Sequence, residues 1–358
     1  MSKVVVGMSG GVDSSVAAYL LKEQGYDVIG ATMQIWQEES VLAEEHKGGC
    51  CGLSAVEDAR RVADTLGIPY YVMNFKQDFK EKVIDYFVAE YKNGRTPNPC
   101  IACNRYVKWE SLLKRSLEIG ADYIATGHYA RILKLPNGRY TVQKSVTEEK
   151  DQTYALYNLT QFQLAHTLMP VGSYEKPKIR EIAEEAKLLV AHKPDSQDIC
   201  FVPDGDYVSF LEEETGQKAK TGNFVDESGA VLGEHQGIWH YTIGQRKGLN
   251  LALGTKSFVK EIRQKTNEVV IGGADSVFSS TMYVEHVNYM AVEKLDKPEK
   301  LCGKIRYAHK GASCLVEPVA DGRLRVTFEQ PQRAMTPGQA AVFYQDDYIV
   351  CGGTIALW

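Results

Sequence analysis

Residues 9–15 read Ser-Gly-Gly-Val-Asp-Ser-Ser and connect a short apolar run to a stretch whose apolar residues recur at helical spacing. The apolar run, Val4–Met8, predicts a buried strand, so the loop joins a strand to the N-terminus of a helix. At such a junction backbone N–H groups and the positive end of the helix dipole point outward together. Gly10 and Gly11 let an anion approach the backbone, while Asp13 adds a carboxylate that could cap the helix or hold Mg²⁺. The stretch therefore predicts a phosphate-binding loop.

This loop differs from the commonest phosphate-binding motifs. No Walker string G-x-x-x-x-G-K-[ST] occurs, and residues 254–257, which come nearest, have the wrong spacing. The dinucleotide fingerprint G-x-G-x-x-G is also missing from this turn. The string S-G-G-x-D-S resembles instead the PP-loop of the N-type ATP pyrophosphatases, which cleave ATP between the α- and β-phosphates and adenylate a carbonyl oxygen. The plainer interpretation is a serine- and glycine-rich turn that caps a helix.

Composition limits the class of protein. A chain of 358 residues with 44% hydrophobic and 24% charged residues predicts a globular protein of roughly two or three domains. The formal net charge of −5 argues against a non-specific nucleic-acid coat protein, although a local basic face remains compatible with it. The sequence shows neither a run of transmembrane length nor a signal peptide, so we expect no membrane association and a cytoplasmic location. There the eight cysteines should be reduced, and clustered ones indicate chemistry or metal binding.

The first third of the chain alternates strand and helix patterns, which predicts a parallel sheet with helices on both faces. The strands are expected at 4–8, 28–33, 70–74 and 123–125, and the helices at 54–66, 78–93 and 107–119. Ligands of such sheets bind beyond the C-terminal strand ends, where loop 9–15 and Thr126-Gly127-His128 should both lie. A polar excursion is expected at 37–47 and a further helical pattern at 159–189. Beyond about residue 216, frequent glycines and alternating apolar residues predict an antiparallel barrel or sandwich.

Cysteines stand in two unusual stretches. In Thr96–Asn104, which contains a C-x-x-C pair, Asn104 is expected to cap the following helix and so to place Cys103 beside the helix N-terminus. That position should lower the pKa of the thiol from about 8.5 and make it nucleophilic. Half of a zinc site is an alternative, with Cys50-Cys51 as an ill-spaced second pair. Cys200, taken alone, is more typical of a buried core cysteine.

Taken together, the PP-loop, the P-N-P-x-x-x-C-N stretch and D-S-Q-D-I-C-F-V resemble the tRNA-specific 2-thiouridylases. The resemblance extends over the whole chain and includes five further motifs: residues 127–130, 150–154, 244–248, 304–307 and 337–339. It implies an α/β fold, in which a parallel-sheet PP-loop catalytic domain (adenine nucleotide α-hydrolase-like) precedes a small connecting domain and a C-terminal antiparallel β-barrel. The expected bounds are 1–212 for the ATP-binding domain, 213–279 for the connecting domain and 280–358 for the tRNA-contacting barrel.

The resemblance also implies roles for individual residues. Those that would bind ATP are Gly7, Met8, Ser9, Gly10, Gly11, Val12, Asp13, Ser14, Met33 and Gly127. Those that would contact the target base or the rest of the tRNA are Asn98, Pro99, Cys100, His128, Lys150, Asp151, Gln152, Arg306, Tyr307 and Gln339. A flipped uridine can stack on aromatic or imidazole faces. Each of the tRNA residues also has a plainer interpretation: a satisfied strand-end histidine at 128, a helix cap at 151–153, or a solvated barrel face at 306–307.

The implied reaction installs sulfur at C2 of the wobble uridine, in the glutamine, lysine and glutamate tRNAs. ATP, with Mg²⁺, would adenylate the C2 oxygen and release pyrophosphate. Cys200 would carry sulfur as a persulfide supplied by a cysteine desulfurase or a sulfur-relay protein. Cys103 would then form a disulfide with Cys200, and a reductant would reset the pair.

This chain departs from the family pattern at Cys100, where much of the family has an aspartate that could activate the thiol. The general base is therefore open, and Cys100, Cys103 and Cys200 together could instead ligate an iron–sulfur cluster. We expect the persulfide route. Two other classes compete with the thiouridylase interpretation. They are a PP-loop ligase that adenylates a small molecule, which needs no cysteine, and a nucleotide-sensing RNA-binding module, which transfers no sulfur.

Overall fold

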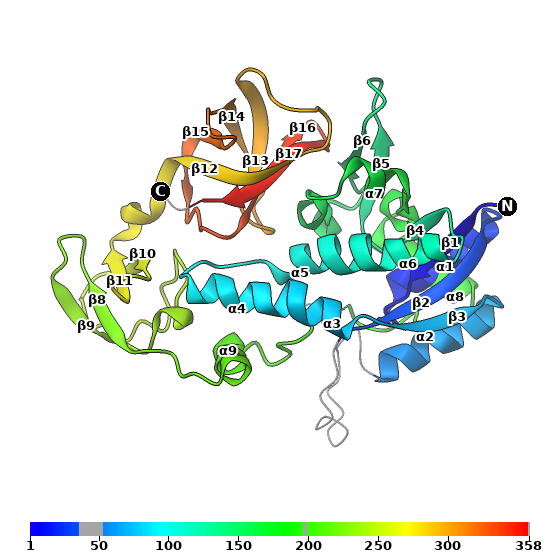
Figure 1. Ribbon diagram of the computed structural model, residues 1–358, viewed down its shortest axis with the longest axis horizontal. Helices are drawn as coiled ribbons and strands as arrows, with labels where there is room; N and C mark the ends of the chain where they lie inside the picture. Colours follow the sequence, from blue (N-terminus) through cyan, green and yellow to red (C-terminus); the bar gives the residue numbers. More distant parts are fainter. Residues whose placement is uncertain (36–52, 196–198, 357–358) are drawn as a thin grey trace. The chain divides into compact units, whose positions relative to one another are not determined.

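The computed structural model describes residues 1–35, 53–195 and 199–356, which divide into two compact units (Figure 1). Unit 1 comprises residues 1–84, 99–205 and 347–350, and unit 2 comprises residues 85–98, 206–346 and the chain from 351 onward. The polar excursion expected at 37–47 lies outside the described residues. No helix in the described ranges is long and apolar enough to cross a membrane.

Unit 1 is built on a parallel sheet. Its strand order is β3 (Tyr70–Asn74), β2 (Asp27–Gln34), β1 (Lys3–Gly7), β4 (Tyr123–Ala125) and β7 (Thr167–Leu168). Every neighbouring pair is parallel. The strands expected from the sequence and the parallel-sheet fold class are thereby confirmed.

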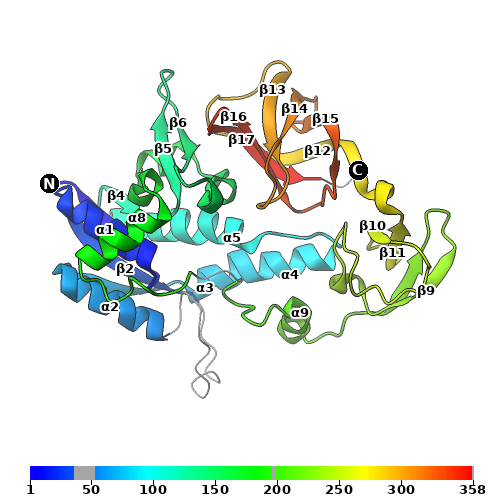
Figure 2. The ribbon, with the colours of Figure 1, turned by 180° about the vertical axis from the view of Figure 1, so that it is seen from behind.

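The alternating side chains of β1 are buried on both faces of the sheet, as a central parallel strand requires. Val4 and Val6 join a core formed with α1 (Val12–Glu23), α2 (Leu53–Leu66) and α8 (Lys176–Glu185). Figure 2 shows α1 and α8 side by side, and the two helices are in contact. This packing brings the N-terminus of α1 to the C-terminal end of β1.

The opposite face of the sheet is covered by a long helical stretch. Its successive parts are α5 (Pro99–Ala102), the π-helical segment η3 (Cys103–Leu112) and α6 (Leu113–Glu118). Gly7 faces this side, because a Cβ placed on it would lie 3.6 Å from a Leu112 methyl carbon. The helix expected at 107–119 is therefore present, but it begins at Pro99. Pro99 occupies the first helical position, where its missing N–H costs nothing and its fixed φ suits the helix.

Other helical patterns of unit 1 are interrupted. The helix expected at 78–93 consists of α3 (Lys76–Phe79), η2 (Lys80–Ile84, π-helical) and α4 (Asp85–Lys92), the last of which belongs to unit 2. The pattern at 159–189 is not one helix; it contains α7 (Gln161–Ala165), β7, η6 (Pro170–Ser173) and α8. Pro170 opens a new turn here because it cannot continue a helix begun before it.

The remaining elements of unit 1 form a hairpin and short turns. Strands β5 (Ala130–Lys134) and β6 (Tyr140–Lys144) are antiparallel, and Gln143 of β6 pairs with Tyr348. The 3₁₀ turns η4 (Glu148–Lys150) and η5 (Thr153–Leu156) follow. Residues 347–350 thus join this unit although they are close to the end of the chain.

Unit 2 contains a small sheet and a barrel. The small sheet has the order β10 (Phe258–Arg263), β11 (Glu268–Gly272), β8 (Gly222–Val225), β9 (Val231–His235). Short helical elements flank it: α9 (Tyr207–Thr215), η7 (Ile238–His240) and η8 (Ala274–Val277). The barrel strands are β12 (Phe278–Tyr289), β13 (Glu299–Lys304), β14 (Ala312–Pro318), β15 (Leu324–Arg333), β16 (Ala340–Gln345) and β17 (Tyr348–Ile355). Their order, β12-β15-β14-β13-β16-β17, closes through the β12–β17 pairing and confirms the expected antiparallel barrel.

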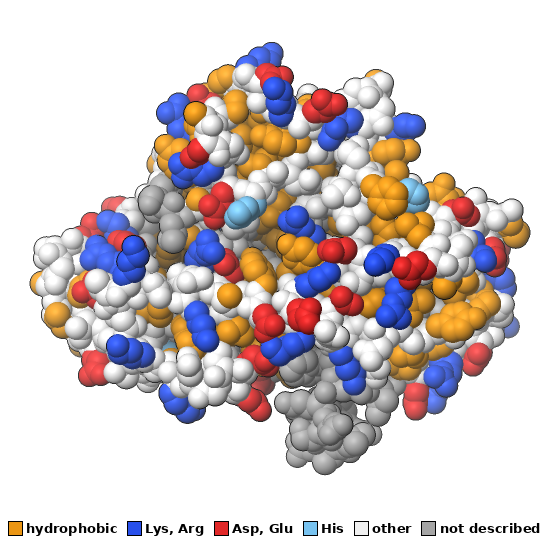
Figure 3. All heavy atoms as spheres, in the orientation of Figure 1, with side chains coloured by type: hydrophobic (Ala, Val, Ile, Leu, Met, Phe, Trp, Pro, Cys, Tyr) orange, Lys and Arg blue, Asp and Glu red, His pale blue; other side chains and the backbone are white. Residues whose placement is uncertain are grey.

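Basic and acidic side chains are interspersed over the face drawn in Figure 3. This mixture agrees with the small net charge of −5. It contrasts with the broad single-sign surface of a non-specific nucleic-acid coat protein.

Candidate functional site

The loop between β1 and α1 is shaped by its glycines. Gly11 is the residue before the helix and is extended (φ −101°, ψ 166°), while Gly10 has a left-handed backbone (φ +69°). A Cβ on Gly10 would lie 2.4 Å from the carbonyl oxygen of Ala55 in α2, which is far inside van der Waals contact. Only glycine therefore fits at position 10. The first N–H groups of α1, which have no partner within the helix, face the loop.

The loop hydroxyls bond within the loop itself. The Ser14 hydroxyl accepts from the Ser9 N–H at 3.1 Å and lies 3.2 Å from the Gly11 carbonyl oxygen, to which it donates. Ser15 donates to the same carbonyl at 2.9 Å. No side chain caps α1, so Asp13 does not act as the helix cap that the sequence allowed. Its carboxylate turns to other partners.

The other residues expected around ATP lie in unit 1, next to this loop or at the same end of the sheet. Gly127 abuts the start of α1, because a Cβ on it would come 2.5 Å from the Ser14 nitrogen. Met8 is buried, and its carbonyl accepts from the Thr32 hydroxyl at 2.7 Å. Met33 follows on β2, two residues after Ala31, which pairs with Gly7. The C-terminal strand ends therefore meet here as the sequence predicts.

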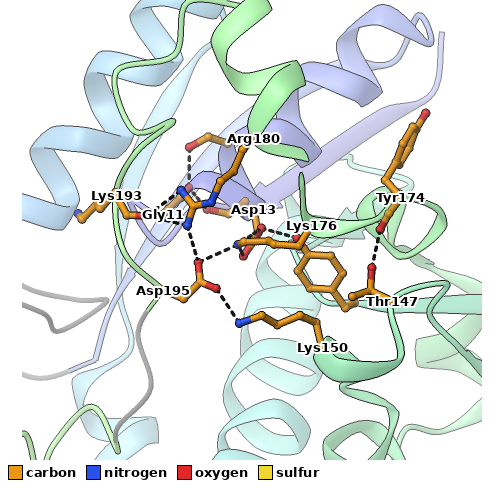
Figure 4. Close-up of polar contacts among 12 residues, drawn as sticks. Gly11, Asp13, Thr147, Lys150, Tyr174, Lys176, Arg180, Lys193 and Asp195 are labelled. Atoms are coloured by element: carbon orange, nitrogen blue, oxygen red, sulfur yellow. Dashed lines mark hydrogen bonds and ion pairs between the residues drawn. The ribbon is translucent and has the colours of Figure 1, made fainter. Parts of the chain in front are cut away.

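Asp13 is part of a network of ion pairs (Figure 4). Its carboxylate accepts from the Lys176 ammonium at 2.7 and 2.9 Å and from the Tyr129 hydroxyl at 2.7 Å. Lys176 also lies 2.7 Å from a carboxylate oxygen of Asp195, whose other oxygen is 2.9 Å from the Lys150 ammonium. The network thus connects the loop to the segment that leads toward Cys200.

Two more cations border the network. The Arg180 guanidinium is 3.4 Å from Asp195 and donates to the Ala191 carbonyl at 2.7 Å. Lys193 donates to the Gly10 carbonyl at 3.0 Å and pairs with Asp58 at 2.7 Å. The loop is consequently held by two cations, Lys176 on Asp13 and Lys193 on Gly10.

The network sets the protonation of its members. Burial opposes ionisation of Asp195, but the hydrogen bonds from Lys176 and Lys150 outweigh it and lower the pKa of this carboxyl below its ordinary value. Burial, together with the neighbouring Asp13 carboxylate, raises the pKa of the Tyr129 hydroxyl far above its ordinary value. Asp195 is therefore an anion and Tyr129 a hydrogen-bond donor at neutral pH.

The first cysteine stretch differs from the sequence expectation. The helix begins at Pro99, so Cys100 lies in its first turn, whereas Cys103 lies at the start of η3 beyond that turn. The prediction that Cys103 stands at the helix N-terminus is wrong, because the helix starts earlier than Asn104. Asn104 is buried inside the helix and donates to the Ala155 carbonyl at 3.0 Å instead of capping. Cys100, which is exposed, is therefore the cysteine of this stretch that lies within the first helical turn.

Cys103 and Cys200 are half-buried thiols of unit 1. Phe201, next to Cys200, packs edge-on against Phe79 of α3 with ring centroids 5.7 Å apart. The same short helix contacts η3, which begins at Cys103. Both cysteine segments therefore pack against α3.

The described residues hold no group of three or more His, Cys, Asp or Glu side chains that could bind a metal. Cys100, Cys103 and Cys200 thus do not form a cluster site in this structure. Cys50 and Cys51 lie outside the described residues.

His128 is buried beside the loop. Its ring nitrogens lie 2.7 Å from the Thr126 hydroxyl and 3.4 Å from the Lys108 ammonium, and its ring packs against Trp109. Burial, helped by the charge of Lys108, lowers the pKa of this imidazole well below 6.5. The ring is therefore neutral and has polar neighbours on both sides; an RNA base would have to uncover it.

Residues 150–152 mainly organise the backbone next to Tyr129. The Gln152 side-chain oxygen accepts from the Tyr129 N–H at 2.8 Å. Asp151 is buried and accepts from the Thr153 hydroxyl at 2.7 Å and from the Ser145 N–H at 3.3 Å. Lys150, by contrast, reaches the ion-pair network described above.

The remaining expected tRNA residues belong to unit 2. Gln339 donates to the Thr96 carbonyl at 2.8 Å, and the Thr96 N–H donates to the Pro337 carbonyl at 3.0 Å. Asn98, two residues further on, is half-buried. The Pro337-Gly338-Gln339 motif therefore holds the segment that leads into Asn98.

Arg306 and Tyr307 lie after strand β13 of the barrel. Arg306 donates to the Arg333 carbonyl at 3.0 Å, and Arg333 donates to the Gly244 carbonyl at 2.7 Å. Tyr307 is 47% exposed, so its ring is accessible for stacking. The structure links the motif at 244–248 to this corner of the barrel.

Sequence reasoning missed Lys176 and Lys193 as partners of the loop, and Arg180 as a partner of Asp195. One signal was present: Lys176 stands in the first turn of a helix, where a positive charge is unfavourable with respect to the helix dipole. Such a charge must be compensated by tertiary contacts. Sequence spacing does not reveal which contacts these are.

A parallel sheet whose first loop presents glycines, serines and an aspartate at a helix N-terminus defines an α/β protein of the PP-loop class. Three family models match the chain: a tRNA methyl transferase HUP domain over residues 2–204, a tRNA methyl transferase PRC-barrel domain over 208–273 and an aminomethyltransferase β-barrel domain over 279–355.

Curated relatives match along the whole chain. The tRNA-specific 2-thiouridylase MnmA of Lachnoclostridium phytofermentans is 66% identical over 99% of both chains. Proteins of the same name from Clostridium kluyveri and Clostridium perfringens are 56% and 57% identical, over 99% of this chain and 99% and 98% of theirs. This chain belongs to the tRNA-specific 2-thiouridylase family.

Proposed function

We propose that the protein is an ATP-dependent tRNA uridine 2-sulfurtransferase that converts the wobble uridine to 2-thiouridine and releases AMP and pyrophosphate. The observation that supports this most is that one compact unit contains both the PP-loop and the two cysteines, Cys103 and Cys200. A loop suited to activation and thiols suited to sulfur delivery are what the family's reaction needs.

ATP is proposed to bind at Gly7–Ser14, Met33 and Gly127. The phosphates would meet the N–H groups at the start of α1, where Gly10 and Gly11 present no side chain. Asp13 would hold Mg²⁺, which supplies positive charge for the departing pyrophosphate. The Asp13 oxygens also accept from Lys176 and Tyr129, and a carboxylate has about four lone-pair sites, so Asp13 would keep one site for the metal.

Activation converts a poor leaving group into a good one. The uridine C2 oxygen attacks the α-phosphorus of ATP, the bond to the β-phosphate breaks, and pyrophosphate leaves. The loop N–H groups and the cations beside them stabilise the charge that develops on the phosphates. The C2 oxygen then departs later as part of AMP.

Sulfur delivery is assigned to Cys200. Its persulfide receives sulfur from a cysteine desulfurase or relay protein, and the terminal sulfur attacks C2 so that AMP leaves. The Cys103 thiolate attacks the Cys200 sulfur, which breaks the persulfide S–S bond and leaves a Cys103–Cys200 disulfide; an external thiol reductant restores both thiols. Cys100, exposed in the first helical turn, replaces the family's aspartate near the target base.

Recognition of tRNA is proposed for both units. Asn98, Pro99 and Cys100 would meet the base, and His128, Lys150, Asp151, Gln152, Arg306, Tyr307 and Gln339 would contact the tRNA. We further propose glutamine, lysine and glutamate tRNAs as substrates, a cytoplasmic location, and domain bounds of 1–212, 213–279 and 280–358.

The decisive experiment measures pyrophosphate release from ATP with and without unmodified tRNA, and sulfur incorporation in the same reactions with a desulfurase and cysteine. We expect release to require tRNA. Cys200→Ser should still release pyrophosphate but form no 2-thiouridine, whereas Cys314→Ser, a buried barrel thiol, should transfer sulfur normally. Release that ignores tRNA, or normal sulfur transfer by Cys200→Ser and Cys103→Ser, would favour the small-molecule ligase. Iron analysis of anaerobically purified protein distinguishes the persulfide route from the iron–sulfur cluster route, because the cluster route requires that active protein contain iron.

A further inference from the structure

Lys176 occupies a position that helix energetics disfavour. It is the first residue of α8, where the helix dipole repels a cation, and its side chain is only 12% exposed. A buried lysine at a helix N-terminus needs compensation from elsewhere in the fold. Here the compensation comes from two carboxylates, and neither of them belongs to α8.

The Lys176 ammonium bridges these two carboxylates. It contacts both oxygens of Asp13, at 2.7 and 2.9 Å, and one oxygen of Asp195, at 2.7 Å (Figure 4). An ammonium has three N–H donors, so these contacts use all of them. Asp13 lies in the first turn of α1 and Asp195 lies five positions before Cys200 in the sequence. One cation thus joins the nucleotide loop to the start of the sulfur-carrying segment.

Asp195 is the anchor of that segment. Besides Lys176, it is held by Lys150 at 2.9 Å and by Arg180 at 3.4 Å. Three cations from two elements, α8 and η4, therefore converge on one carboxylate. This concentration of charge holds Asp195 against the N-terminal half of α8 and against η4.

We propose that Lys176 and Asp195 are positioning residues that couple the nucleotide loop to the Cys200 segment. They would hold the loop used for activation at a fixed position relative to the start of the segment used for sulfur delivery. The inference rests on the proposed function, which makes Cys200 the sulfur carrier. Neither residue needs to touch the reacting atoms: Lys176 sets the distance between Asp13 and Asp195, and Asp195 sets where the Cys200 segment starts.

The first test separates the two half-reactions. Asp195→Asn keeps the shape of the side chain and the Lys176–Asp13 pair but removes the second carboxylate. We expect pyrophosphate release within about twofold of the parent, and about tenfold less 2-thiouridine per pyrophosphate released, because one partner of a partly buried ion pair is lost. Lys176→Met should lower both quantities. Lys178→Met, at an exposed lysine of the same helix whose ammonium pairs with Glu181, is the matched control and should change neither.

The second test does not need catalysis. Peptide-resolved alkylation of the protein without ATP or tRNA measures how accessible Cys200 is relative to Cys103. We expect Asp195→Asn to raise the alkylation rate of Cys200 about tenfold while that of Cys103 changes little, and Asp195→Glu, which keeps the charge, to restore most of the protection. Combining Asp195→Asn with Lys176→Met should add little, since both variants remove the same contact.

The outcomes are distinct. The proposal would be overturned if Asp195→Asn formed as much 2-thiouridine per pyrophosphate released as the parent and if its Cys200 were alkylated at the parent's rate. If the parent protein makes no 2-thiouridine at all, the proposed function fails, but the alkylation series still decides whether Lys176 and Asp195 hold the Cys200 segment. Asp195→Asn could melt at a lower temperature than the parent. In that case Asp195→Glu and Lys176→Met are compared with it at the same folded fraction, so that a loss of positioning is distinguished from a loss of folded protein.

Discussion

Gly10 and Gly25 precede and follow helix α1, and both have a left-handed backbone, with φ of +69° and +85°. Their surroundings differ. A Cβ on Gly10 would enter the backbone of Ala55, whereas a Cβ on Gly25 would meet nothing within 4 Å. Alanine at either position adds backbone strain, but only at Gly10 does it also add a steric clash. Comparing the two variants therefore isolates the effect of the clash.

We predict that Gly10→Ala lowers the free energy of unfolding by about 2 kcal/mol more than Gly25→Ala, because only the former forces α2 away from the loop. It should also weaken ATP binding, while Gly25→Ala should not. Urea unfolding and nucleotide titration of the two variants provide the measurement. Equal losses of stability in both would show that α2 does not press on the loop.

His128 predicts a pH dependence of stability. Its pKa in the folded protein is well below 6.5, so below about pH 6.5 the unfolded chain binds a proton at this ring that the folded chain does not. The free energy of unfolding should therefore fall as the pH is lowered from 7 to 5. His128→Gln should reduce this fall, as seen in urea midpoints at the two pH values. An unchanged fall in His128→Gln would show that this buried ring does not carry the effect.

For individual residues, the sequence predicted the loop 9–15 more fully than it predicted the contacts around the loop. The glycines and Asp13 follow one another along the chain, so their local structure could be inferred from the motif. The pairing of Asp13 with Lys176 spans 163 positions and depends on how α1 packs against α8. Periodicity indicates that two helices share a core, but it does not specify which charged ends meet.

Among the elements, the segment at 85–98 shows how a loop is fixed through its side chains. Arg95 lies 2.6 Å from Glu90 and 3.5 Å from Glu285 of β12. Glu90 is buried, and that burial is the main reason why its pKa is raised. The two glutamates hold Arg95, and Gln339 holds Thr96 one residue later.

We predict that Arg95→Met lowers the free energy of unfolding by about 2 kcal/mol, since it leaves the Glu90 carboxylate buried without its cation. Adding Glu90→Gln should recover part of the loss, because the amide needs no counter-charge. Thermal unfolding of both single variants and the double variant gives the coupling energy. Additive losses would contradict the proposed dependence of Glu90 on Arg95.

The helix that begins at Pro99 illustrates why an element boundary can escape sequence reasoning. Asn104 is a good capping residue by type, so the sequence predicted that it would cap the following helix. The fold instead uses Pro99 as the first helical residue and gives Asn104 an acceptor in Ala155. Because that acceptor lies 51 positions away, tertiary contact overrode a local preference.

Over the whole molecule, the two units are interleaved along the chain. Unit 1 includes residues 347–350, where the Asp347 carbonyl accepts from the Lys144 N–H at 2.7 Å and the Asp347 carboxylate accepts from Gln143 at 2.8 Å. The matches of the family models at 2–204, 208–273 and 279–355 follow the linear order of the chain and do not reflect this return.

We predict that a fragment of residues 1–205 unfolds at a lower temperature than the full chain and with lower cooperativity, because strand β6 loses its partner at 347–350. Circular dichroism melting of the two proteins tests this. Full-length Asp347→Ala, which removes only the side-chain contacts, should lose about 1 kcal/mol and remain cooperative. A fragment that melts like the full chain would show that the returning segment contributes nothing to unit 1.

The return of the chain at 347–350 also orders events during synthesis. A ribosome completes the segment that carries the PP-loop first, yet the last strand segment of the same unit is added only when 347 or more residues have been made. A chain released early therefore ends with an incomplete nucleotide-binding unit as well as an open barrel. Synthesis as far as residues 347–350 is therefore a condition for a complete unit 1, because a shorter chain leaves the edge of β6 at Gln143 without its partner Tyr348.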